Sequence, residues 1–203
     1  MTRSGDGARY DRAYFDKWYR NPRHRVKSAA ELERQVRFVL YSAEWVLGRP
    51  VRSVLDVGCG EGNWRSVLRG LRPRLAYEGI DPSEYAVARF GEARNIRRGG
   101  IEDVQRVARR REYDLIVCCG MLNYLDEQQL RSGVQQVAAK AGGVAYLEVF
   151  TSDDAFEGDT SWSAPRATRW YQQLIRDAGL HSIGMHCYIP ARRAQLVASL
   201  ERV

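Results

Sequence analysis

This 203-residue sequence has no long apolar run and no C-x-x-C motif, and lysine is rare in it. No run approaches the roughly 20 apolar residues of a membrane span, and the N-terminus lacks the apolar segment of a secretory signal. Cys59, Cys118, Cys119 and Cys187 show no C-x-x-C spacing, which favours buried, reduced thiols over a metal site or a disulfide framework. We therefore expect a cytoplasmic protein that binds neither a metal nor a membrane.

The positive charge of the chain comes almost entirely from arginine. The net charge is +7 and the isoelectric point is near 9.4, yet only Lys17, Lys27 and Lys140 are lysines. The basic residues are spread along the chain, apart from short clusters at 20–27 and 106–111. Dispersed arginine is more typical of a solvated surface than of a nucleic-acid groove. A nucleic-acid partner is therefore disfavoured, but charge alone leaves it open.

Composition and pattern predict one α/β domain. Hydrophobic residues make up 44% of the chain and charged residues 28%, which is ordinary for a globular protein. Tyr10, Tyr14 and Trp18 share one helical face before Asn21-Pro22 breaks the helix, and a capping box at Ser28 opens a second helix. The pattern then predicts strands at 52–57, 75–80, 94–97, 113–119 and 143–150, and helices at 62–70, 83–90, 103–110, 126–140 and 165–178.

The last part of the chain predicts a pair of antiparallel strands. Two strand-like runs, His181–Ile189 and Ala194–Leu200, are separated by Pro190-Ala-Arg-Arg. Such closeness is typical of a hairpin. The fold class that follows is a doubly wound, mostly parallel seven-stranded sheet, with helices on both faces and a terminal antiparallel hairpin.

The most informative segment is Val-Leu-Asp-Val-Gly-Cys-Gly-Glu-Gly at 54–62. A strand carrying Asp56 ends in a loop with glycines at 58, 60 and 62 and then enters a helix. Such loops let the backbone approach a nucleotide-like cofactor. A dinucleotide fingerprint requires G-x-G-x-x-G, and Asn63 stands where that pattern needs its third glycine. The spacing therefore disfavours a nicotinamide-dependent dehydrogenase.

A second acid lies where the next strand ends. Asp81, in Glu-Gly-Ile-Asp-Pro, follows Asp56 by 25 residues. A carboxylate at such a strand tip can accept hydrogen bonds from both ribose hydroxyls, although Asp81 is also suited to capping the following helix. The glycine run and Asp81 together resemble motifs I and II of the class I S-adenosylmethionine-dependent methyltransferases, over roughly residues 28–203.

This resemblance implies a set of cofactor contacts. The loop at Gly99-Gly100-Ile101-Glu102-Asp103 corresponds to the segment that touches the adenine, with Ile101 on the ring and Glu102 or Asp103 at its amine, and we favour Glu102. The fourth strand and its continuation would lie beneath the methionine part. Residues 1–27 would form a lid over the cofactor, and 28–203 the methyltransferase domain. The expected cofactor-binding residues are Asp56, Gly58, Cys59, Gly60, Gly62, Asp81, Pro82, Ile101, Glu102, Cys119, Gly120, Leu122, Tyr14 and Arg25.

The acceptor side is less determined by the sequence. Tyr124 and Glu148 are the expected catalytic residues if a general base is needed, with His181 and His186 as alternatives, and His186 is more typical of a packed strand residue. Trp18 in the lid and Phe156 and Trp162 in the loop after the fifth strand are expected to shape the substrate site. The strand end at Cys119-Gly-Met-Leu lacks the two prolines of the amino-methylating nucleic-acid enzymes.

We therefore expect an enzyme that uses S-adenosylmethionine, releases S-adenosylhomocysteine and methylates N or O of a small molecule. The alternatives are an RNA or protein methyltransferase that docks through its arginine clusters, and a module that binds the cofactor without transferring a methyl group. The expected assembly is a monomer or a homodimer.

Overall fold

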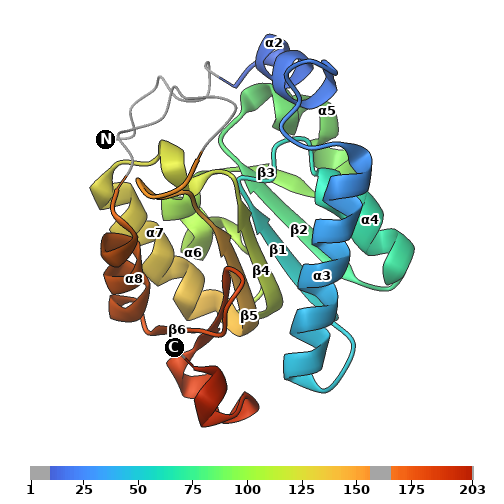
Figure 1. Cartoon of the computed structure of the whole chain (residues 1–203). Coiled ribbons are helices and arrows are strands. Elements are labelled where there is room, and N and C mark those ends of the chain that lie inside the picture. The colour runs from blue at the N-terminus through green and yellow to red at the C-terminus, as the bar shows by residue number, and fades with distance from the viewer. Residues whose placement is uncertain (1–9, 156–165, 203) are drawn as a thin grey trace.

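The computed structural model describes residues 10–155 and 166–202, which form a seven-stranded sheet between two layers of helices (Figure 1). The strand order is β3-β2-β1-β4-β5-β7-β6. The first five strands are parallel, and β7 runs antiparallel to both β5 and β6. The strands are β1 Ser53–Val57, β2 Ala76–Asp81, β3 Ile96–Arg98, β4 Tyr113–Cys119, β5 Ala141–Glu148, β6 Leu180–Ser182 and β7 Cys187–Pro190. The expected fold class is confirmed.

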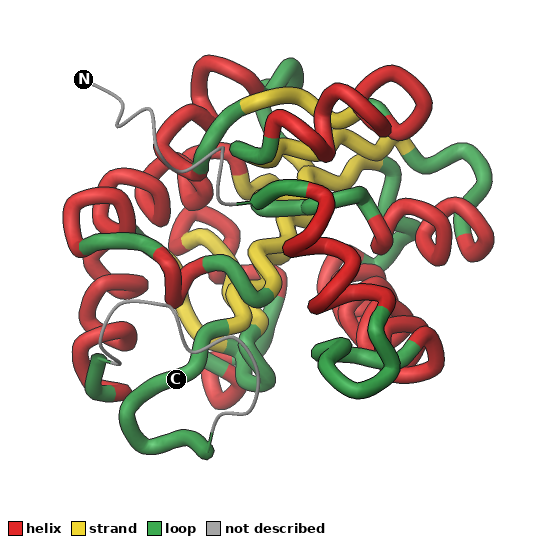
Figure 2. Tube along the Cα trace, turned by 90° about the horizontal axis from the view of Figure 1, so that it is seen from above, coloured by secondary structure: helices red, strands yellow, loops and turns green. Residues whose placement is uncertain are grey.

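The helices cover both faces of the sheet, as Figure 2 shows from above. One face packs against α3 and α4, and the other packs against α6, α7 and α8. The predicted capping box opens α3, and a second one opens α7: the side chains of Ser28 and Asp126 each accept a hydrogen bond from the backbone three residues later. The main helices are α3 Ala29–Leu47, α4 Asn63–Leu71, α5 Glu84–Arg94, α6 Val104–Val107, α7 Glu127–Lys140 and α8 Thr168–Asp177.

Neighbouring residues of the central strands enter two separate cores. Val54 and Leu115 belong to the core beneath α3 and α4, whereas Leu55 and Ile116 belong to the core beneath α7 and α8. Because both faces are covered, apolar residues stand at consecutive positions of these strands instead of alternating with polar ones. The parallel strands therefore bring their carboxyl ends to one edge of a rigid sheet.

The terminal hairpin exists, but its predicted boundaries are wrong. Both of its strands come from the run at 181–189, and residues 191–196 form a 3₁₀ helix instead of a strand. The run is interrupted at Gly184, Met185 and His186, which all have positive φ and turn the chain back on itself. His186 accordingly lies exposed in the turn and not within a strand.

The predicted helix at 103–110 is also shorter than expected. It consists of a 3₁₀ helix at Ile101–Asp103 followed by α6, which ends at Val107. None of the helices in the described ranges combines the length and apolarity required to cross a bilayer.

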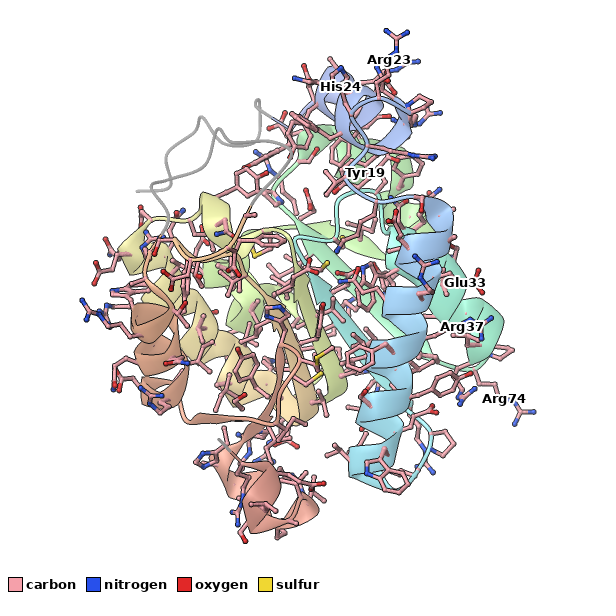
Figure 3. All side chains as sticks on the ribbon, in the orientation of Figure 1. Tyr19, Arg23, His24, Glu33, Arg37 and Arg74 are labelled. Carbon is pink, nitrogen blue, oxygen red and sulfur yellow. The ribbon has the colours of Figure 1, made fainter. Side chains whose placement is uncertain are left out.

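The N-terminal segment lies over one end of the sheet, beside α5 (Figure 1). It contains α2 Arg12–Phe15 and a π-helix at Asp16–Arg20. Its buried residue is Phe15, while the predicted face of Tyr10, Tyr14 and Trp18 is only half-buried. We call residues 10–27 the lid segment. Arg23 and His24 lie at its outer tip, and Tyr19 lies on the side nearer the sheet (Figure 3).

Candidate cofactor and active site

The glycine loop at 58–62 joins β1 to α4 at the carboxyl edge of the sheet. Gly58, Gly60 and Gly62 all have positive φ, between 54° and 77°, a region that side chains with a Cβ rarely adopt. The backbone N–H groups of Gly58 and Cys59 both donate to the carbonyl of Ile80, at 2.8 and 3.2 Å. The loop is thereby fixed to the end of β2, next to Asp81.

Asp81 connects the glycine loop to the start of α5. One carboxylate oxygen accepts the N–H of Gly60 at 2.6 Å, and the other accepts the N–H of Ser83 at 2.9 Å. Burial raises the pKa of Asp81, although these two hydrogen bonds oppose that effect. Pro82 follows directly, half-buried. The predicted capping of α5 by Asp81 is not what the structure shows: the cap is Ser83, whose hydroxyl accepts the N–H of Ala86, and Asp81 accepts the N–H of Ser83.

Asp56 is buried below the loop, and the pKa of its carboxyl group is raised. Its carboxylate accepts a hydrogen bond from the hydroxyl of Tyr77 at 2.7 Å. Burial raises its pKa to about 7, the Tyr77 hydrogen bond opposes this shift, and the charge of Asp81 adds to it. Cys59 is also buried, with its sulfur packed beneath Gly79 of β2. A cationic group that arrives at this edge therefore meets an acid that ionises near neutral pH.

Glu102 provides an unpartnered acceptor at the neighbouring strand end. Its Oε2 is buried and has no hydrogen-bond partner among the residues that the structure describes, which is rare for a carboxylate oxygen. Its carboxylate lies where a side chain on Gly100 would lie, because a Cβ there would come within 2.5 Å of Oε2. Asp103 is already engaged, by the N–H of Gly100 and by Arg106. Of the two acids left open by the sequence, Glu102 is thus the one with a free acceptor.

Ile101 does not reach this edge with its side chain. It is fully buried and packs against Gly133 of α7, where a Cβ would come within 2.7 Å of Ile101 Cγ1. The expected packing of this side chain on an adenine ring stays a prediction. Burial of Ile101 instead anchors the loop that carries Glu102.

Lid residues pack directly on the glycine loop. A Cβ on Gly60 would lie 3.0 Å from Phe15 Cε1 and 3.1 Å from the hydroxyl oxygen of Tyr19. A Cβ on Gly58 would lie 2.6 Å from Cγ of Met121. Arg20 forms an ion pair with the buried Glu61 of the loop. The lid segment and Met121 therefore cover the loop.

The other predicted lid residues lie at different distances from the loop. Tyr14 makes edge-to-face contacts with Tyr10, at 5.1 Å, and with Phe15, at 5.6 Å. Trp18 lies beside His24 and Lys17, towards the outer part of the lid. Arg25 is exposed. The structure thus brings Tyr14 into the aromatic layer over the loop, but neither Trp18 nor Arg25 contacts the loop.

The ends of β4 and β5 form the remaining side of the site. Cys119 and Glu148 are direct neighbours across these strands, and Cys119 Sγ lies 2.9 Å from Glu148 Oε2. Gly120 is exposed with φ 69°, whereas Leu122 is buried in the core. Tyr124 is half-buried and touches the edge of Tyr10, 6.4 Å away between ring centres.

Two predicted substrate residues, Phe156 and Trp162, lie outside the described residues. Within residues 10–155 and 166–202, no group of three or more His, Cys, Asp or Glu side chains is arranged to hold a metal ion. Sequence patterns alone missed Phe15, Met121, Lys27 and Gln35. Phe15 lies one position off the tyrosine stripe, and the other three reach the site through contacts far apart in the chain.

The sequence matches the protein family described as "Methyltransferase domain" over residues 15–194. No curated protein matches it significantly in sequence. Three similar solved structures illustrate the fold. An S-adenosylmethionine-dependent methyltransferase from Archaeoglobus fulgidus is 15% identical, with a TM-score of 0.63 over 83% of this chain and 73% of that one.

A magnesium protoporphyrin IX methyltransferase from Synechocystis PCC 6803, with bound S-adenosylhomocysteine, is 16% identical and has a TM-score of 0.58 over 90% of this chain and 94% of that one. An amino pentose methyltransferase from Micromonospora echinaspora is 21% identical, with a TM-score of 0.54 over 71% and 61%. The family match confirms the interpretation of the sequence as an S-adenosylmethionine-dependent methyltransferase of the class I type. This chain belongs to the methyltransferase domain family.

Proposed function

We propose that this protein transfers the methyl group of S-adenosylmethionine to an oxygen or nitrogen of a small molecule. The observation that carries the proposal is the grouping at one sheet edge of three features suited to a nucleoside cofactor. These are the glycine loop, the Asp81 carboxylate bound to it, and the unpartnered oxygen of Glu102. An orphaned buried carboxylate oxygen fits a donor such as the exocyclic amine of adenine.

Each group has a specific role in this proposal. Asp81 accepts hydrogen bonds from the ribose hydroxyls, and Glu102 accepts one from the adenine amine. The glycine loop would hold the methionine part, and the ionised form of Asp56 beneath the loop would balance its ammonium charge. The cofactor supplies a methyl group already activated by the sulfonium, so the protein mainly needs to orient the acceptor and exclude water. The aromatic layer of Tyr10, Tyr14 and Phe15 is suited to excluding water.

Small-molecule chemistry is supported by two of the similar structures, which by their names act on a porphyrin and an amino sugar. Tyr124 and Glu148 remain our candidates for contacting the acceptor. We place this activity in the cytoplasm.

The alternative of docking to RNA or protein finds less support in the arginines. Several of them pair with buried or half-buried acids, including Arg20 with Glu61, Arg49 with Asp114, Arg72 with Glu44 and Arg97 with Glu78. In the cluster at 106–111, Arg106 pairs with Asp103. Steeply salt-dependent binding to bulk RNA would favour that alternative.

Calorimetric titration with S-adenosylhomocysteine tests the proposal. We expect clear binding to the wild type and a loss of at least about tenfold in Asp81→Ala, because a hydrogen bond to a charged group contributes about 1.5–3 kcal/mol. Glu84→Gln is the matched control, since it removes an exposed acid three residues away that pairs with Arg98. Circular dichroism verifies that both variants fold. Unchanged affinity in folded Asp81→Ala would refute the ribose assignment.

A further inference from the structure

A cluster of five polar side chains lies at the carboxyl ends of β4 and β5. We call it the Lys27 cluster, and it comprises Lys27, Gln35, Cys119, Tyr146 and Glu148. The ammonium of Lys27 lies 3.0 Å from each oxygen of Glu148, 2.9 Å from Gln35 Oε1 and 3.6 Å from Cys119 Sγ. Three parts of the chain, the base of the lid segment, α3 and the sheet, therefore meet at one carboxylate.

Gln35 completes the arrangement from α3. Its amide nitrogen donates to Glu148 Oε1 at 2.8 Å and to the hydroxyl of Tyr146 at 2.9 Å. The hydroxyl of Tyr146 itself lies 3.3 Å from the same carboxylate oxygen. Oε1 is therefore surrounded by strong donors, and its position is determined by the protein alone.

Oε2 of Glu148 has a different set of partners. Besides Lys27, its partner is the thiol of Cys119 at 2.9 Å. A thiol is a weak donor, so an O–H or N–H from a bound molecule can replace it at little cost. The side chain of Glu148 retains 12% of its exposure, and the carboxylate lies at the strand edge that also carries the glycine loop. This oxygen is thus the one suited to meeting an acceptor.

Charges on the neighbouring elements favour the ionised carboxylate. Burial works to raise the pKa of Glu148, but Lys27 and the hydrogen bonds from Cys119 and Gln35 outweigh it and lower the pKa. Burial favours the neutral form of Lys27 and acts to lower its pKa, yet Cys119 and Glu148 outweigh it and raise the pKa. Burial raises the pKa of Cys119, and the charge of Glu148 adds to this shift, with a smaller contribution from Asp56. Burial and the charge of Glu148 also raise the pKa of Tyr146.

We propose that Lys27 is a positioning residue that fixes the Glu148 carboxylate in the orientation needed to bind an acceptor bearing an O–H or N–H. This rests on the proposed methyl transfer. The acceptor's O or N atom uses a lone pair to form the bond to the methyl carbon. Its proton moves to Oε2 of Glu148 in the same step. The carbon–sulfur bond breaks at the same time and leaves its electron pair on sulfur. Acceptors without such a hydrogen gain nothing from this arrangement.

Carboxyl-carbon NMR of protein labelled in its glutamate side chains tests the inference without a known acceptor. The Glu148 resonance is assigned by its loss in Glu148→Gln and followed from pH 3 to pH 9 in the presence of S-adenosylhomocysteine. We expect Lys27→Met to raise the Glu148 midpoint by about one unit or more, since an opposite charge at this distance typically shifts a carboxyl by 1–3 units. Lys27→Arg should restore most of the wild-type behaviour.

Lys17→Met is the matched control, because this lysine lies over Trp18 in the lid segment and should leave the Glu148 midpoint unchanged. If Lys27→Met does not fold, Gln35→Leu, which removes a neutral donor to the same carboxylate, should raise the midpoint by a smaller amount. An unchanged midpoint in a folded Lys27 or Gln35 variant overturns the inference. Failure of the proposed function is distinguishable, because the wild type would then bind no S-adenosylhomocysteine in the same samples.

Discussion

At the scale of single residues, the site is defined by acids in contrasting surroundings. Asp56 is buried with one hydroxyl donor, and its pKa rises to about 7. Glu148 is half-buried beside a lysine, and its pKa falls. Asp114, at the start of β4, belongs to the second kind: burial alone would raise its pKa, but the Arg49 guanidinium and the backbone N–H groups of Arg52 and Ser53 lower it. Ionisation of Asp56 therefore destabilises the fold, whereas ionisation of Glu148 and Asp114 stabilises it.

The raised pKa of Asp56 predicts that the free energy of unfolding depends on pH. Between its ordinary value of 3.8 and about 7, the folded protein holds a proton that the unfolded chain has lost. Stability is therefore lost as the pH rises through that window, by up to about 4 kcal/mol for a shift of this size. We expect Asp56→Asn, which keeps an acceptor for Tyr77, to be more stable than the wild type at pH 8.

Urea unfolding of both proteins at pH 4.5 and pH 8 measures this difference. The advantage of Asp56→Asn should shrink at pH 4.5, where the wild-type carboxyl is protonated. Asp114→Asn serves as the opposite control, because its partner Arg49 favours the charged form and the variant should lose stability at pH 8. An advantage of Asp56→Asn that is equal at both pH values would contradict the assignment.

At the scale of elements, the lid segment competes for the surface of the glycine loop. Phe15 is 2% exposed and lies against Gly60, and its burial contributes about 1.5–3 kcal/mol. The hydroxyl of Ser83 donates to the carbonyl of Tyr10, and Arg20 pairs with Glu61. In the proposed binding mode the lid segment shifts from these contacts when a ligand lies along the loop.

This competition predicts an unusual effect of truncating a buried aromatic residue. We expect Phe15→Ala to bind S-adenosylhomocysteine several-fold more tightly than the wild type, because less stabilisation is lost when the lid moves. Trp18→Ala is the control, since Trp18 lies beside His24 away from the loop. The measurement is the dissociation constant from calorimetry. Weaker binding in Phe15→Ala would show instead that the ring contacts the ligand.

Local patterns predicted the elements better than the contacts between them. The glycine loop and Asp81 were predictable, because glycines that allow positive φ and an acid at a strand end can be recognised in short stretches of the sequence. Phe15 was not, since a π-helix follows it and shifts the buried face from the tyrosine stripe. The Lys27–Glu148 pair joins residues 121 apart, and no local pattern reports such a contact. The hairpin boundary failed because Met185 and His186 adopt positive φ without being glycine.

At the scale of the whole molecule, the sheet is unevenly protected. β1 and β4 are flanked by strands on both sides and by helices on both faces. β3 and β6 form the two edges of the sheet, with three residues each. The lid segment is attached mainly by Phe15 and by side-chain hydrogen bonds. Opening free energies should therefore differ greatly across the fold.

Native-state hydrogen exchange should reveal this order. We expect the amides of β1 and β4 to exchange only through global unfolding, while those of β6 and the lid exchange through local opening. Adding urea in small steps should accelerate amide exchange in β1 and β4, with the same dependence on urea concentration as global unfolding. Equal denaturant dependence for β6 and β4 would contradict this hierarchy.

The strand order also affects how the protein is made. β1 pairs with β2 soon after both leave the ribosome, but its other partner is β4, where Val54 lies opposite Leu115. At typical synthesis rates of about 5–20 residues per second, the intervening chain takes about 3–12 s to appear. For that time one side of an apolar strand has no partner, and unpaired edges favour association with other chains. The central position of β1 thus makes the nascent chain most vulnerable midway through translation.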